Sequence, residues 1–182
     1  MTLNQLLKEV YSLGFDEAEG ISESFVFSVN RALKMIFTEL VPSNLAKIKV
    51  GARDEKSFDI RTRVANVLFV TSLPMDSSGF AIKGAYVDGY TVTLPSGFTG
   101  DAFIRYKPSV KEVSVDSGEE EIDIPDYASY FLPLLTAFFV FLDDDSEKAD
   151  YYMSLYRSEV GKLSRSHSLS LSNTYTDVTG WA

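Results

Sequence analysis

The feature that most constrains this chain is an uncharged run of sixteen residues, 127–142. A membrane-spanning helix needs roughly 17–25 apolar residues. The run falls short of that length and contains Pro133. It is bounded by Asp126 and the acidic triplet 143–145, without the flanking Lys or Arg that orient a span. A helix that is apolar on every side is buried on every side. The run therefore predicts a core helix, buried either within one chain or more completely against a neighbouring subunit.

Two helices are predicted before this run, because apolar residues recur with the period of a helix. The first covers residues 3–13, and Thr2 and Gln5 have the spacing of a capping box at its start. The second begins after Ser22 and ends at Pro42.

The uncharged run itself predicts one continuous helix over residues 125–142. A further helix is predicted over residues 146–164, with Asp144 and Glu147 at capping-box spacing.

Between the two helix pairs, the apolar pattern changes to the alternation that is typical of strands. The segments are AKIKV, KSFDI, NVLFVTS, FAIKGAYV, YTVTL and AFIRYK. Asp88-Gly89 suits a tight hairpin, because glycine accepts a positive φ. Residues 47–115 therefore predict a small antiparallel β module.

The order of these elements predicts an α+β fold. It has a bundle of about four helices, an inserted antiparallel β subdomain and an extended C-terminal arm. The bundle is assigned to residues 1–45 and 122–165, the β subdomain to 46–121 and the arm to 166–182. Apolar residues are set among Ser and Thr in the arm, which favours docking on another chain. A frayed terminus is the alternative.

The net charge of −9 is unevenly distributed, because residues 111–150 hold twelve acidic and two basic side chains. Such a surface repels free nucleic acid, and it could meet a basic partner or line a conduit through which DNA slides. Plain solubility is the alternative. The basic cluster among the first strands is either a solvated edge or a contact with an acidic neighbour. Its members are Lys47, Lys49, Arg53, Lys56, Arg61 and Arg63.

No constellation of residues predicts catalysis, a cofactor or a metal. The single histidine, His167, lies among serines without an orienting carboxylate. The triplet 143–145 lacks the spaced ligands of a calcium loop and suits a helix N-terminus. The chain has no cysteine, which excludes disulfides and thiolate metal sites. We expect a protein that is not an enzyme, and a small ligand-binding domain or enzyme is the alternative.

Several stretches together resemble one family. They are TLNQLLKEVYSLGF, VNRALKMIFTEL, GAYVDGYTVTLPSGFTGDAFIRYKP, IDIPDYASYFLPLLTAFFVFLDDDSEKADYYMSLYRSEV and the closing YTDVTGWA. The chain resembles the head–tail adaptor (connector) proteins of tailed bacteriophages, in particular those called tail tubular protein A or gatekeeper in short-tailed phages. A stopper-type neck or tail-completion component is the alternative within the same class.

The resemblance implies a structural virion protein at the neck, assembled in the host cytoplasm. It implies a ring, typically dodecameric, between the portal protein and the tail or nozzle protein. Double-stranded DNA would pass through this ring without sequence-specific binding. The resemblance implies no membrane among the partners. The portal-binding arm would use Leu169, Leu171, Tyr175, Val178 and Trp181. The bundle core and subunit contact would use Tyr130, Phe131, Phe138, Phe139 and Phe141.

Overall fold

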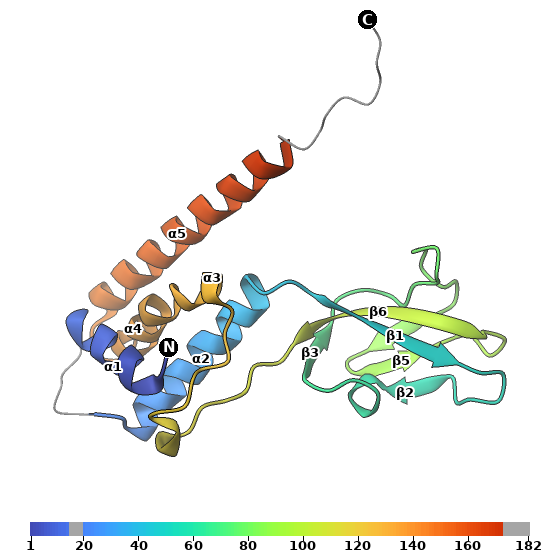
Figure 1. The fold of residues 1–182 in the computed structure, drawn as a ribbon, viewed down its shortest axis with the longest axis horizontal. Coiled ribbons are helices and arrows are strands. Elements are labelled where there is room, and N and C mark those ends of the chain that lie inside the picture. Colours follow the sequence, from blue (N-terminus) through green and yellow to red (C-terminus); the bar gives the residue numbers. More distant parts are fainter. Residues whose placement is uncertain (15–19, 173–182) are drawn as a thin grey trace, which may run out of the picture. The chain divides into compact units, whose positions relative to one another are not determined.

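The structure is a computed structural model that describes residues 1–14 and 20–172 (Figure 1). Its element order confirms the α+β fold that the sequence predicts. The α-helices are α1 (Leu3–Ser12), α2 (Glu23–Glu39), α3 (Asp126–Ser129), α4 (Leu132–Phe141) and α5 (Ser146–Ser172). The strands are β1 (Asn44–Val50), β2 (Ser57–Asp59), β3 (Val67–Val70), β4 (Tyr86–Asp88), β5 (Thr91–Thr93) and β6 (Gly100–Pro108). Two short 3₁₀ helices are η2 (Ile60–Thr62) and η3 (Val115–Ser117).

The chain forms two compact units. The helical unit comprises residues 1–14, 20–32, 114–120 and 130–172 of the described chain, and the strand unit comprises residues 33–113 and 121–129. The division runs through α2, whereas the sequence places it after the helix, at residue 45. The second half of α2 belongs to the strand unit together with residues 121–129.

Helix α1 begins with the predicted capping box. The Oγ1 atom of Thr2 accepts the amide of Gln5 at 3.2 Å, and Oε1 of Gln5 accepts the amide of Thr2 at 2.8 Å. These bonds satisfy two amides that a helix start otherwise leaves unpaired. At the other end, the Tyr152 hydroxyl of α5 donates to the carbonyl of Leu13. This hydrogen bond joins α5 to the end of α1, and burial raises the pKa of Tyr152.

The predicted continuous helix over residues 125–142 is wrong, because the chain breaks it into α3 and α4. Pro133 lies in the first turn of α4. A proline ring inside a helix would collide with the carbonyl four residues earlier, which here belongs to Ser129. The proline is tolerated in a first turn, so the helix restarts at Leu132. Helix α4 then contacts both α1 and α5 (Figure 1).

Helix α5 is longer than the sequence predicts, because it continues from Ser146 to Ser172 instead of ending near residue 164. The expected extended conformation is therefore wrong for residues 166–172. Residues 162–172 contain no Gly or Pro, so no helix-breaking residue stops a helix that has already begun. The alternating SLSLS pattern is too short to exclude a helix.

None of the described helices could cross a membrane. The most apolar of them, α4, has only ten residues.

The strand unit holds two three-stranded antiparallel sheets, with the strand orders β1-β6-β3 and β2-β5-β4. Their common core consists of Ile48, Val50, Phe58, Ile60, Val67, Ile82, Val92, Leu94, Ala102 and Ile104. The segment FAIKGAYV forms a strand only at its end, in β4. Gly84 adopts a φ of +82°, which breaks the extended conformation before that strand.

The predicted hairpin at Asp88-Gly89 is confirmed. It joins β4 to β5, with Asp88 opposite Thr91 and Gly89 at a φ of +57°. An L side chain in this left-handed region costs about 1–2 kcal/mol.

Gly89→Ala should therefore lower the free energy of unfolding by about 1–2 kcal/mol. A Cβ at Gly89 would meet no atom within 4 Å, so the cost comes from the backbone alone. Gly97→Ala is the matched control, since Gly97 is equally open but has no positive φ. Urea unfolding of the two variants checks this, and equal midpoints would contradict the hairpin geometry.

Candidate functional site

The five aromatic residues predicted for the core and subunit contact fall into three environments. Phe131 (4% exposed) and Phe141 are buried in the helical unit. Phe138 and Phe139 are half-buried, and Tyr130 is 64% exposed. Helix α4 and the two residues before it are therefore covered on one side and open on the other.

The buried side of α4 packs against α5 through ring contacts. Phe131 meets Tyr156 edge to face, with 5.9 Å between the ring centroids. Phe141 stacks on Tyr152 at 5.8 Å. These rings hold α4 in place, so the position of its open side is fixed by the core.

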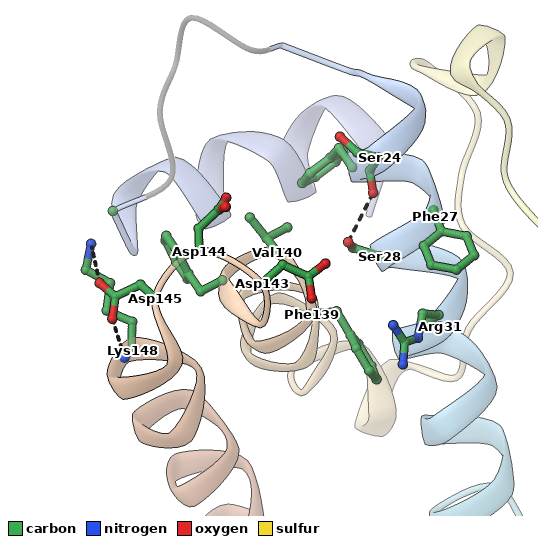
Figure 2. A pocket seen from close by; sticks show the side chains of 13 residues that line it. Ser24, Phe27, Ser28, Arg31, Phe139, Val140, Asp143, Asp144, Asp145 and Lys148 are labelled. Carbon is green, nitrogen blue, oxygen red and sulfur yellow. Dashed lines mark hydrogen bonds and ion pairs between the residues drawn. The ribbon is translucent and has the colours of Figure 1, made fainter.

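The open side of α4 lies beside the first half of α2, and an arginine joins them (Figure 2). The guanidinium carbon of Arg31 lies 4.5 Å from the ring centroid of Phe139 and 5.6 Å from that of Phe27. Phe27 is 63% exposed. Among the described residues, Arg31 makes no ion pair with a carboxylate. The two rings and the cation therefore form a continuous surface open to solvent, which we call the aromatic groove.

The aromatic groove is a hollow of about 440 Å³ that also contains parts of the α4–α5 turn. Its polar wall is formed by the exposed Asp143 and Asp144 (Figure 2). On the α2 side, the Ser28 hydroxyl donates to the carbonyl of Ser24 at 3.0 Å. Phe25, Phe141, Asp145 and Lys148 also line the hollow, so the groove combines four aromatic rings, two cations and three carboxylates.

The third aspartate of the triplet serves the helix. The Oδ1 atom of Asp145 accepts the amide of Lys148 at 3.1 Å, and Oδ2 lies 3.5 Å from the Lys148 ammonium. Asp145 therefore caps α5, whereas the sequence predicted Asp144 in this position. The helix begins one residue later than that prediction requires, at Ser146.

Two polar groups of the groove, Ser28 and Asp145, form hydrogen bonds within their own segments. The Ser28 hydroxyl donates within its own helix, and no base among residues 1–14 and 20–172 forms a hydrogen bond that would activate it. No group of three metal-ligating side chains gathers anywhere in residues 1–14 and 20–172. Exposed rings beside charged groups are instead typical of surfaces that bind other proteins.

The predicted basic cluster does not form one surface. The Nη2 atom of Arg61 lies 2.5 Å from Oδ2 of Asp59, and its guanidinium covers the ring of Tyr90 at 4.1 Å. The hydrogen bonds from the side chain and the amide of Arg61 lower the pKa of Asp59. Lys56 donates to the carbonyl of Gly51. Lys56 and Arg61 therefore stabilise turns, and Arg63 lies over the ring of Phe58, whereas Lys47 and Lys49 share one face of β1.

Sequence reasoning missed Arg105, which strand register brings to the same sheet face as these two lysines. In β6, Arg105 lies opposite Leu45 and Phe103 lies opposite Lys47. The alternation in both strands could have shown which residues share a face within each strand. It could not show that β1 pairs with β6, since about fifty residues separate the two strands.

The predicted arm lies largely outside the described residues. Leu169 and Leu171 fall within α5. Tyr175, Val178 and Trp181 are beyond Ser172, where the description ends, so their role stays a prediction.

No family model, no curated protein and no solved structure matches the chain. Its function is therefore inferred from the surfaces of the two units.

Proposed function

We propose that this chain is a structural adaptor that assembles into a ring and joins a portal to a tail, as its resemblance to phage head–tail adaptors implies. The observation that carries the proposal is the aromatic groove. The exposed Phe27 and the half-buried Phe139 form an apolar surface of the helical unit, next to Arg31. Exposed apolar surface of this kind marks interaction sites on soluble proteins.

Assembly would complete the burial of α4. In the single chain, the helix keeps Phe138, Phe139 and Val140 only half-buried and Leu142 exposed. Burial of apolar area contributes about 25 cal/mol per Å², so covering these side chains favours association. Arg31 is pre-positioned between two rings, which reduces the entropy lost when a partner binds.

The remaining parts follow from the resemblance and are proposed with it. The portal protein would bind the C-terminal arm and cover the aromatic groove, and a tail or nozzle protein would bind the opposite side of the ring. Acidic residues would face the channel, where like charge lets DNA pass.

A stopper-type neck component is the second candidate. The helical unit of α1, the first half of α2, α4 and α5 supports the adaptor, since a stopper-type component would lack a long helical bundle.

The groove is tested by the double variant Phe27→Ser and Phe139→Ser, mixed with the portal ring from the same genome. We expect at least a tenfold loss of binding, because aromatic side chains at interface centres contribute about 2 kcal/mol or more each. Analytical gel filtration of the mixture measures co-elution with the ring.

Tyr86→Ser is the matched control, because Tyr86 is similarly exposed but lies in the strand unit, on β4. It should co-elute as the unmodified chain does, and circular dichroism confirms that each variant is folded. Undiminished co-elution of the groove variant, or failure of the unmodified chain to bind, would contradict the proposal.

A further inference from the structure

The sheet β1-β6-β3 has one buried face and one open face. Alternate residues of β1 and β6, such as Ile48 and Ile104, belong to the core of the strand unit. The residues between them form the opposite face, because side chains alternate along a strand. We call it the outer sheet face, and it consists of Leu45, Lys47, Lys49, Phe69, Asp101, Phe103, Arg105 and Lys107.

The outer sheet face combines apolar side chains with cations. Leu45 is 53% exposed and Phe69 is 40% exposed. The ammonium of Lys47 lies 2.9 Å from Oδ2 of Asp101 and 5.9 Å from the ring centroid of Phe103. Lys49 and Arg105 are exposed, and neither forms an ion pair within the described chain. An open sheet face is ordinarily polar throughout, so the exposed Leu and Phe indicate a binding surface.

The same chain carries a surface of opposite charge. Residues 112–126 contain seven acidic and no basic side chains, whereas residues 44–110 contain nine basic and six acidic ones. Glu112 is paired with Lys34 at 2.6 Å, and Glu119 accepts a hydrogen bond from Asn4. Glu121 and Asp123 are exposed on either side of the buried Ile122. We call residues 112–126 the acidic segment.

We propose that the outer sheet face of one copy binds the acidic segment of a second copy. This inference rests on the proposed function and names two surfaces through which the copies meet. Lys49 and Arg105 would pair with Glu121 and Asp123, while the exposed leucine and phenylalanine of the sheet lose contact with water. Complementary charge steers such surfaces together and selects the partner.

The contact joins two different surfaces, so each copy uses both. Such a heterologous contact repeats from copy to copy and gives a closed ring when the rotation between neighbours fits. A ring is the assembly that the proposed function requires.

Nucleic acid is a less suitable occupant for this face. Of the four cations on it, Lys47 is already paired with Asp101 and Lys107 donates to the carbonyl of Val41. The net charge of −9 repels a polyphosphate at long range. An acidic protein segment offers fewer charges and presents them next to apolar side chains.

The test is a charge swap, followed by sedimentation velocity of the full chain. One variant carries Lys49→Glu and Arg105→Glu, and the other carries Glu121→Lys and Asp123→Lys. We expect the unmodified chain to self-associate at 50 mM salt and to do so at least tenfold more weakly at 500 mM, because salt screens exposed charges. Each variant alone should lose at least tenfold in self-association. An equimolar mixture of the two should recover it, since each altered surface then meets its complement.

The matched control carries Lys8→Glu and Lys83→Glu, two exposed lysines outside the outer sheet face. It changes net charge as the sheet variant does and should self-associate like the unmodified chain. The inference is overturned if the unmodified chain stays monomeric, if either swap variant associates normally, or if the mixture does not recover.

A second measurement tests whether nucleic acid occupies the outer sheet face. Fluorescence anisotropy with a short DNA duplex at 50 mM salt should show no binding that depends on Lys49 and Arg105. Such binding would assign the outer sheet face to nucleic acid and overturn the inference. Because this experiment uses no portal, its failure leaves the aromatic groove and its portal test standing.

Discussion

Phe131→Ala should lower the free energy of unfolding of the helical unit by about 3–5 kcal/mol. Phe131 is 4% exposed and lies at the start of α4, where its ring meets Tyr156 edge to face. Truncation removes that contact and leaves a cavity beneath α5. The cavity cannot collapse readily, since Leu132 and Leu135 in the same helix are themselves fully buried. Urea unfolding followed by circular dichroism measures the loss.

Tyr130→Ala is the control for this prediction, because Tyr130 is adjacent in sequence but 64% exposed. Its ring also contacts Phe131, with 5.6 Å between centroids, so a loss of up to about 1.5 kcal/mol is expected. Equal losses for the two variants would show that α4 does not bury the side of the helix that the structure assigns to the core.

The second large effect is expected in the strand unit, from Ile104→Ala. Ile104 is fully buried in β6, the middle strand of its sheet, and lies opposite Ala46 of β1. Removal of a buried isoleucine side chain costs about 2–5 kcal/mol. The most protected amides of β1 and β6 should then exchange at least about 30-fold faster in native-state hydrogen exchange.

Arg105→Ala provides the comparison on the same strand, since Arg105 is exposed on the opposite face of the sheet. Its effect on exchange should be small when measured at 500 mM salt, where charged contacts between copies are screened. Protection that stays unchanged in the Ile104 variant would contradict the strand pairing.

Local signals account for the parts of the fold that the sequence predicts well. The capping box of α1 needs only Thr2 and Gln5, and the β4–β5 hairpin needs only a glycine at a left-handed position. Each of these features depends on residues within four positions of one another. The burial of α4 also follows from a local property, its lack of charge. The break before α4 is also a local effect, of Pro133, and the rule that proline belongs in a first turn could have located it.

Features that depend on chain-wide geometry could not be predicted in the same way. The aromatic groove instead requires Phe27 and Arg31 of α2 to lie beside Phe139, more than one hundred residues later. The outer sheet face likewise requires the register of β1 on β6. Periodicity shows which residues share a face of one element, but not which elements meet.

The most direct test of the adaptor proposal is electron microscopy of the chain mixed with the portal ring from the same genome. We expect a ring of this chain on one end of the portal, and its symmetry gives the number of copies. A chain that ends at Ser172 lacks Tyr175, Val178 and Trp181, and it should leave the portal bare while remaining folded. A folded, full-length chain that leaves both ends of the portal bare would contradict the account.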